Sequence, residues 1–241
     1  NDQFAGDPGS ITSWSITFEV NGAVWTPVTG LYTDANTLIP YVAGTMAATV
    51  YPKPTTTTTY NASLSTATCT SGTGSSTVTV LVPASITTQP ANATVCAGAN
   101  AVFTVTAAGT SLAYQWQLST DNGTTWANIT NENGATLTIP GTTTALSGRR
   151  YRVIITNTCN TVTSNAATLT VNGLTAVTAT DLWNRRICLS DTLVPLVGSP
   201  VGGSWSGIGV SGFNFIPGAT AVGTYTLTYS YTNAAGCTNT A

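Results

Sequence analysis

The sequence Ala113-Tyr114-Gln115-Trp116-Gln117-Leu118 places one Trp in a short run of the alternating kind that predicts a half-buried β-strand. A Tyr and then a Cys follow it in Thr-rich sequence, and the same order recurs twice more along the chain. The three copies are Trp25, Tyr60 and Cys69; Trp116, Tyr151 and Cys159; and Trp205, Tyr229 and Cys237. Repetition at this period predicts a tandem array of small domains.

Composition narrows the class of protein and of partner. Charged residues make up 6% of the chain, the net charge is -2 and there is no His, so nucleic acid is not expected as a partner. No stretch approaches the roughly 18 apolar residues of a membrane span. The abundance of Thr, Ser, Asn, Gly and Val favours strands and turns over helices, which predicts an all-β fold.

The same composition argues against catalysis. A Ser or Thr nucleophile needs an activating base, and a chain without His offers a poor choice. The eight carboxylates are dispersed, and no acidic loop of the calcium-binding kind is present. We therefore predict that the chain is not an enzyme and holds no cofactor and no metal.

The central copy can be read strand by strand, because its apolar residues alternate. The expected strands are 93–95, 101–106, 113–118, 136–139, 151–156 and 167–171. Trp116 then falls on the third strand, where an immunoglobulin-like sandwich keeps its core Trp. The two positions that form the disulfide between the sheets of antibody domains hold Val105 and Val153, and Val153 lies two residues after Tyr151. We expect these four residues in the core, with Trp25 and Trp205 as the core Trp residues of the other copies.

The cysteines stand at the ends of the predicted domains. Cys96 precedes the second strand of the central domain and Cys159 follows the sixth, and Cys188 and Cys237 repeat these places in the third. In a seven-stranded Greek key these places lie at opposite poles, whereas a disulfide needs Cα atoms within about 7 Å. Two pairings stay open: one bond inside each domain, or a bond between domains that joins Cys96 to Cys237. Cys69 has no partner in its own domain. Paired cysteines without a zinc-type spacing indicate an oxidising, extracellular setting.

Several segments resemble the Ig-like and PKD-like repeats of large surface adhesins of Bacteroidota. The segments that carry this resemblance are Ile86-Thr87-Thr88-Gln89-Pro90, Val95-Cys96-Ala97-Gly98, Tyr114-Gln115-Trp116-Gln117, Ser164-Asn165-Ala166-Ala167-Thr168-Leu169-Thr170-Val171, Trp25-Thr26-Pro27, Gly202-Gly203-Ser204-Trp205-Ser206-Gly207 and Gly236-Cys237. The resemblance implies export by a type IX system and display on the cell surface. It also implies an O-glycan on Thr192, because Asp191-Thr192-Leu193 is similar to the glycosylation pattern of that family.

The predicted organisation is four segments. Residues 1–20 resemble the tail of a P-type jelly-roll domain, on the stretch Gly6-Asp7-Pro8-Gly9-Ser10-Ile11-Thr12-Ser13-Trp14-Ser15-Ile16-Thr17-Phe18. Residues 21–82, 83–172 and 173–241 are expected to be β-sandwiches, the last one incomplete at its C-terminal end. Both ends of the chain are expected to be cut from a longer protein.

Two further patterns concern the surface. Trp126 and Trp183 lie outside the core Trp position, so they are the candidates for stacking on sugar rings, with burial between domains as the alternative. The segment from Ser119 to Trp126 is similar to the Asp-box hairpin of sialidases, but a single copy indicates only a hairpin.

The sequence therefore predicts a non-catalytic, surface-displayed spacer or fibre-forming segment of an adhesin-like protein. Its expected partners are neighbouring domains of the same chain, other copies in a fibre and surface glycans. Two alternatives come from other classes: a spacer within a large secreted peptidase or other enzyme, and a glycan-binding module.

Overall fold

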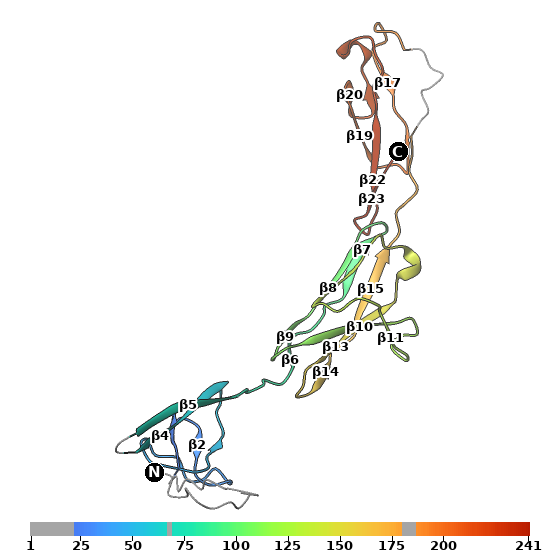
Figure 1. Ribbon diagram of the computed structural model, residues 1–241. Coiled ribbons are helices and arrows are strands. Elements are labelled where there is room, and N and C mark those ends of the chain that lie inside the picture. The colour runs from blue at the N-terminus through green and yellow to red at the C-terminus, as the bar shows by residue number, and fades with distance from the viewer. Residues whose placement is uncertain (1–21, 67–68, 180–186) are drawn as a thin grey trace, which may run out of the picture. The chain divides into compact units, whose positions relative to one another are not determined.

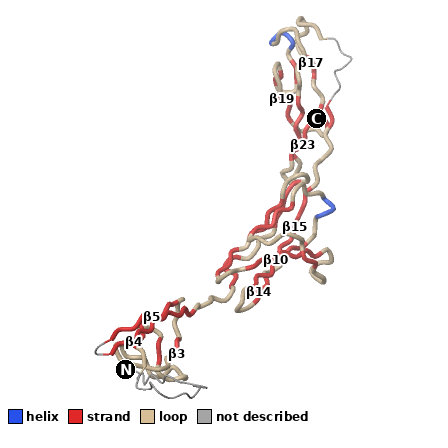
Figure 2. The backbone as a smooth tube through the Cα atoms, viewed as in Figure 1, coloured by secondary structure: helices blue, strands red, loops and turns tan. Residues whose placement is uncertain are grey.

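The computed structural model of the chain describes residues 22–66, 69–179 and 187–241. These residues form short strands joined by turns and loops (Figures 1 and 2). The helices of this described part are two single-turn 3-10 helices, η1 (Thr144–Leu146) and η2 (Pro217–Ala219). The predicted all-β class of immunoglobulin-like sandwiches is confirmed. The stretch 1–20, predicted to be a domain tail, lies outside the described residues.

The chain divides into two compact units between Leu81 and Val82. The second unit contains two separate hydrophobic cores. We call residues 22–81 the first domain, residues 82–172 the central domain and residues 173–241 the third domain.

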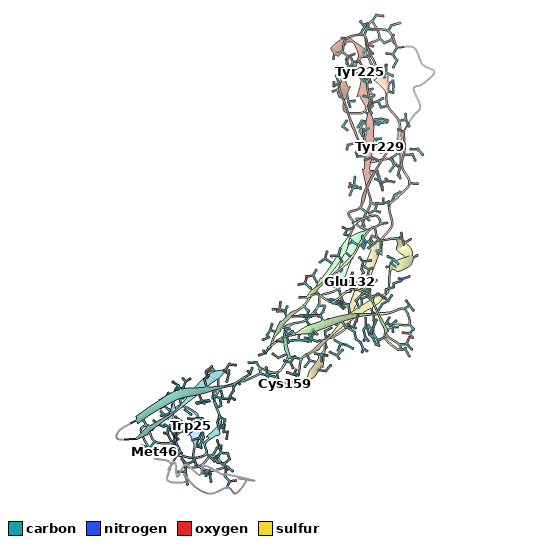
Figure 3. The ribbon with its side chains drawn as sticks, viewed as in Figure 1. Trp25, Met46, Glu132, Cys159, Tyr225 and Tyr229 are labelled. Atoms are coloured by element: carbon teal, nitrogen blue, oxygen red, sulfur yellow. A yellow bond between two sulfur atoms is a disulfide. The ribbon has the colours of Figure 1, made fainter. Side chains whose placement is uncertain are left out.

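The first domain is built on a three-stranded antiparallel sheet. Its order is β1 (Val24–Thr26), β4 (Thr58–Thr66) and β5 (Cys69–Val78), while β2 (Leu31–Tyr32) pairs separately with β3 (Tyr51–Pro52). Leu31, Tyr41 and Tyr60 are its buried residues, and Trp25 packs partly buried against them (Figure 3). The indole N–H of Trp25 donates to the carbonyl of Ala47 at 3.0 Å. The core of this domain is small.

The central domain is a two-layered sandwich. Its strands are β6 (Ser85–Thr88), β7 (Ala93–Cys96), β8 (Ala101–Thr104), β9 (Thr106–Ala108), β10 (Ala113–Ser119), β11 (Ala127–Asn128), β12 (Thr136–Ile139), β13 (Arg150–Thr156), β14 (Thr161–Thr163) and β15 (Ala167–Asn172). One sheet has the order β11-β10-β13-β15-β7, with β14 also on β13, and β8 pairs with β12 and β6 with β9. Strand β7 runs parallel to β15, which brings the start of the domain beside its end.

The core of the central domain lies between these sheets. Trp116 and Val153 are cross-strand partners and fully buried, and Val105 and Tyr151 are each 2% exposed. The rings of Phe103 and Tyr151 lie 4.8 Å apart between centroids. Because the positions of the antibody-type disulfide hold Val105 and Val153, apolar packing joins the two sheets there.

The third domain has shorter strands and a smaller core. Its strands are β16 (Thr178–Ala179), β17 (Val194–Pro195), β18 (Gly198–Ser199), β19 (Ser204–Ser206), β20 (Val210–Ser211), β21 (Asn214–Phe215), β22 (Thr228–Thr232) and β23 (Thr238–Thr240). They form the sheets β19-β22-β23 and β17-β21-β20 and the pair β16-β18. Val194, Leu196 and Phe215 are buried, with Trp205 partly buried against them. The indole nitrogen of Trp205 is buried and has no hydrogen-bond partner within the described part of the chain.

The strand register places the Tyr residue of the third copy differently from those of the first two. Trp25 pairs with Ala62 and Trp116 with Val153, so Tyr60 and Tyr151 each stand two residues before the partner of the Trp. In the third domain Trp205 pairs with Tyr229 itself, and their ring centroids lie 5.2 Å apart.

Two glycines explain how the third domain accommodates this Tyr ring. A Cβ atom added to Gly198 or Gly203 would lie 2.5 Å from the ring of Tyr229, so both positions must lack a side chain. The hydroxyl of Tyr229 donates to the carbonyl of Pro200 and accepts the N–H of Gly203 at 2.8 Å. The ring therefore fills the space that the glycines leave.

We predict that Gly203→Ala destabilises the third domain by about 1–3 kcal/mol, because the new methyl group meets the Tyr229 ring and the carbonyl of Ser230. Urea unfolding of the full chain, followed by hydrogen exchange resolved by domain, measures the effect. Gly134→Ala is the matched control, since its nearest neighbours lie 3.8 Å from the new Cβ and its φ is not positive. An equal effect of the two substitutions would contradict the account of Tyr229.

Candidate functional site

The junction between the central and third domains holds a disulfide. The sulfur atoms of Cys96 and Cys237 are bonded at 1.98 Å, and the Cα atoms lie 5.6 Å apart. Cys96 ends β7, and Cys237 precedes β23 in the hairpin after β22 and is 1% exposed. Of the two pairings that the sequence leaves open, the structure contains the one between domains.

The parallel pairing of β7 with β15 puts Cys96 at this junction. Cys96 is the register partner of Asn172, the last residue of β15, and the N–H of Ala97 donates to the Asn172 carbonyl at 2.8 Å. The sulfur of Cys237 lies 4.0 Å from the same carbonyl oxygen. A disulfide sulfur carries no proton, so this is a contact and not a hydrogen bond. Cys96 therefore stands where the chain leaves the central domain for the third.

An asparagine side chain holds the linker on the other side of the bond. The Oδ1 atom of Asn233 accepts the N–H groups of Ala235 and Cys237, each at 3.0 Å. Its Nδ2 donates to the carbonyl of Gly173 at 2.9 Å. One amide thus shapes the hairpin that carries Cys237 and binds the first linker residue. We call this arrangement the linker clasp.

The central domain has the same clasp at its opposite end. The Oδ1 atom of Asn157 accepts the N–H groups of Cys159 and Asn160, at 3.0 and 3.1 Å. Its Nδ2 donates to the carbonyl of Val82 at 2.8 Å and to that of Thr110 at 3.1 Å. Sequence analysis missed both Asn residues, although an Asn a few residues before each hairpin Cys is the signal that could have identified them.

The other cysteines differ in environment. Cys159 and Cys188 are exposed and carry free thiols. Cys159 lies in the clasped hairpin of the central domain (Figure 3). Cys69 begins β5, and its side chain lies outside what the structure describes. Its lack of a partner stays a prediction.

Of the two candidate sugar-stacking residues, only Trp126 is described. Its ring is half-buried, and the guanidinium carbon of Arg152 lies 4.2 Å from the ring centroid. The Nε of Arg152 in turn donates to Oε1 of Gln117 at 2.8 Å. One face of the indole is therefore occupied by a cation within the same domain. Trp183 falls outside the described residues.

The candidate glycan acceptor lies in an accessible place. Thr192 is exposed and follows a turn in which the N–H of Asp191 donates to the Cys188 carbonyl at 3.0 Å. The Oδ2 atom of Asp191 accepts the N–H of Cys188 at 3.0 Å. The carboxylate of Asp191 is thus engaged with the turn, and the neighbouring residue Thr192 is exposed.

The segment from Ser119 to Trp126 forms the expected hairpin around one carboxylate. Asp121 accepts the hydroxyl of Thr125 at 2.6 Å, the N–H of Thr125 at 2.9 Å and the hydroxyl of Ser119 at 2.8 Å. These bonds, those of Thr125 first, lower the pKa of Asp121 to about 2. Through these hydrogen bonds the carboxylate of Asp121 stabilises the turn between β10 and β11.

We predict that Thr125→Val raises the pKa of Asp121 toward its ordinary value, because the largest cause of the shift is lost. The pKa of Asp121 is lower in the folded chain than in the unfolded chain, where it is about 3.9. The hydrogen bonds of Asp121 therefore stabilise the fold fully above that unfolded value, and this stabilisation is lost as the pH falls toward 2. Titration of the side-chain carboxyl by carbon-detected NMR measures the pKa. Thr124→Val is the control, because Thr124 donates to the backbone carbonyl of Asp121; an equal rise in both variants would refute the assignment.

Residues 22–66, 69–179 and 187–241 contain no cluster of three or more His, Cys, Asp or Glu side chains that could hold a metal ion. One surface hollow in the central domain, of about 440 Å³, is lined by residues such as Gln89, Asn92 and Val102, with no acidic or basic side chain. A second, about 290 Å³, lies beside Tyr229 and is lined by Leu196, Val201 and Phe213. The absence of a cofactor and of catalysis stays a prediction.

Comparison with known proteins gives partial matches. A family model described as a domain of unknown function, DUF8696, matches residues 85–173, which is the central domain. Endoglucanase C of Cellulomonas fimi is 38% identical over 73 residues, 30% of this chain. The matched part is 6% of the length of that enzyme.

Solved structures that match include proteins with immunoglobulin-like domains. A chimeric titin Z1Z2 is 25% identical over 39% of this chain and 99% of its own, with a TM-score of 0.32. Drosophila OTK extracellular domains 3–5 are 18% identical over 60% and 47% of the two chains, with a TM-score of 0.35. DIP-gamma IG1+IG2 is 16% identical over 59% and 81%, with a TM-score of 0.37. The assignment of the fold rests on the strand pairings described above.

Proposed function

We propose that this chain is a non-catalytic spacer of a surface-displayed, adhesin-like protein, in which a disulfide between consecutive domains limits extension under load. The observation that carries the proposal is the bond between Cys96 and Cys237, which joins two domains and not two sheets of one domain. A linker clasp reinforces the same junction through Asn233 and Gly173.

The disulfide between Cys96 and Cys237 lets a pulling force bypass the residues that lie between these two cysteines. A pull applied along the chain reaches Cys96, crosses to Cys237 through the sulfur atoms and continues to the C-terminus. The residues between them, including nearly all of the third domain, lie in a closed loop with a sequence separation of 141. Force along the backbone therefore cannot draw out that loop while the disulfide is intact.

We predict that reduction adds one large increment to the length of the chain when it is stretched. The separation of 141 residues corresponds to about 460–510 Å of extended chain. Single-molecule force spectroscopy on the full chain, held at both termini, measures the total length released with and without a reductant. Cys96→Ser should behave as the reduced protein does, whereas Cys159→Ser should behave as the oxidised wild type does. Equal released lengths in both redox states would disprove the route through the disulfide.

Display outside the cell is the second part of the proposal. Structural disulfides persist in oxidising compartments, which supports an extracellular or surface location. Among the described residues there is no helix long and apolar enough to span a membrane. Export by a type IX system and assembly into filaments rest on the resemblance of the repeats alone.

Electron microscopy of native cells, labelled with antibodies raised against residues 82–241, tests this display. The expected result is label on thin projections at the cell surface, in intact and unpermeabilised cells. Label on compact particles that also contain a catalytic domain would replace the adhesin proposal with an enzyme spacer. Label only after permeabilisation would overturn surface display.

The enzyme-spacer alternative has one observation in its favour. The match to Endoglucanase C covers a small part of that enzyme, as expected if a module of this kind accompanies a separate catalytic domain. The glycan-binding alternative depends on Trp126, whose ring offers only the face not covered by Arg152. Loss of glycan retention in Trp126→Ala, with Arg152→Ala retaining it, is the result that favours that alternative.

We also predict that Thr192 carries an O-glycan in the native protein, because the residue is exposed and the segment Asp191-Thr192-Leu193 is similar to the glycosylation pattern of the adhesin family. Intact mass spectrometry of native material should show a mass above that of the polypeptide, and Thr192→Ala should remove the excess. A native mass equal to that of the bare chain would contradict the modification.

A further inference from the structure

The central domain carries two guanidinium groups on the outer face of the sheet that contains β11, β10 and β13 (Figure 1). Arg150 and Arg152 alternate along β13 with Tyr151 and Val153, which are buried in the core. Because successive side chains of a strand point to opposite faces, both Arg side chains leave the sheet on the side away from the core. Two of the six Lys and Arg residues of the chain therefore share this face.

The domain itself holds Arg152 in place on two sides. The Nε of Arg152 donates to Oε1 of Gln117 at 2.8 Å, and Nε2 of Gln117 in turn donates to Oδ1 of Asn128 at 2.8 Å. Gln117 is 9% exposed, so this support is nearly buried. The guanidinium carbon lies 4.2 Å from the centroid of the Trp126 ring, which covers one face of the cation. The position of the guanidinium group is thus fixed before any ligand binds.

The hydrogen-bonding capacity of Arg152 is mostly unused. A guanidinium group has five N–H donors, and within the described part of the chain only the one on Nε has an acceptor. The two terminal nitrogens, Nη1 and Nη2, carry the other four. In this planar group two parallel N–H bonds match the two oxygens of a carboxylate. Arg152 therefore presents a preorganised fork for an anion.

Arg150 adds a second cation beside the same ring. A Cβ atom built on Gly123 would lie 3.6 Å both from Nη1 of Arg150 and from the ring carbon Cζ2 of Trp126. Nη1 of Arg150 donates to the carbonyl of Asn122 at 3.1 Å, whereas its Nε is buried and has no hydrogen-bond partner among the described residues. The bonds of both Arg residues go to neutral oxygens, so their charges stay available to an anionic ligand.

The surroundings of the two Arg residues favour a hydrophilic ligand. Asn128 is exposed, and its Nδ2 donates to no described residue. In the central domain, all of which the structure describes, the exposed large apolar residues are Val82 and Val102, and neither belongs to this sheet. The core of a protein–protein interface is largely apolar, and this face offers no such centre. A saccharide, in contrast, supplies hydroxyl groups that accept from an amide and can carry a carboxylate.

We propose that this face of the central domain is a binding site for an acidic saccharide, whose carboxylate is held by Arg152. Nη1 and Nη2 of Arg152 donate two parallel hydrogen bonds to the carboxylate oxygens, Arg150 contributes its charge, and Nδ2 of Asn128 donates to a sugar hydroxyl. Trp126 acts as a positioning residue for the cation and does not stack on the sugar. The site adds ligand binding to the proposed spacer role and does not depend on it.

NMR of the full chain, observing the Nε–Hε signals of the Arg side chains, tests the site without any substitution. The probes are tetragalacturonate, a hyaluronan tetrasaccharide and sialyllactose, each paired with its carboxyl methyl ester, which keeps the sugar and removes the charge. At least one acid should shift the Arg152 signal and bind about tenfold more tightly than its ester, because the charge-assisted bonds are lost in the ester. No shift of Arg152 with any acid, or equal binding of every acid and its ester, would overturn the site.

Tetraglutamate is the probe for a protein partner. It carries carboxylates but no hydroxyl groups, so we expect it to bind more weakly than the best acidic saccharide. An equal affinity would replace the saccharide with an acidic peptide as the ligand.

Substitutions separate the fork from its charge. Arg152→Lys keeps the charge and loses both the parallel donors and the bond to Gln117, so it should bind the acid about tenfold more weakly than the wild type does. Lys53→Ala is the control, since it removes a positive charge from the first domain, and it should leave binding unchanged. Circular dichroism checks that each variant is folded. Wild-type affinity in folded Arg152→Lys would refute the fork, and retained binding in folded Arg152→Ala would favour stacking on Trp126 in its place.

Discussion

The bond between Cys96 and Cys237 is the constraint on which the second unit of the chain depends. In the chain-entropy model, closing a loop with a sequence separation of 141 residues stabilises the folded state by about 5 kcal/mol, through the freedom that the unfolded chain loses. That value is comparable with the whole stability of a marginal domain, about 5–15 kcal/mol. A bond at this position therefore matters both to the equilibrium between folded and unfolded states and to the route taken by tension.

The bond can form because backbone pairing and an amide side chain bring its two ends to the linker. The parallel register of β7 on β15 sets Cys96 opposite Asn172, and the clasp of Asn233 shapes the hairpin that presents Cys237. Both the backbone pairing of β7 with β15 and the hydrogen bonds of Asn233 use uncharged groups. Since no charged side chain takes part in the clasp, salt and mild changes of pH should leave its hydrogen bonds in place. The junction is therefore held by uncharged groups and one covalent bond, in a chain with few charges.

Much of this fold follows from local sequence. Alternating residues predicted the strands of the central domain closely, and the two Val residues in the place of a disulfide indicated correctly that the sheets pack without one there. The expected strand directions placed Cys96 and Cys159 at opposite ends of the central domain. A disulfide between domains was therefore one of the two pairings that the sequence left open. The choice between those options needed the actual path of the linker.

What could not be predicted depends on contacts distant in sequence. The shift of Tyr229 to the position opposite Trp205 requires Gly198 and Gly203 to leave room for the ring, and nothing local marks these glycines as its partners. The clasps were missed because a side-chain amide bonded to a linker carbonyl leaves no periodic signal. The cover of Trp126 by Arg152 likewise joins side chains from different strands.

The placement of the cysteines at the poles has a mechanical consequence that an internal disulfide would lack. A bond between positions 105 and 153 would enclose only part of the central domain, so tension could still draw out the third. The bond between 96 and 237 encloses most of one domain and nearly all of the next with a single crosslink. Each sandwich is then stabilised by apolar packing around its Trp residue, while the covalent bond protects the pair from extension.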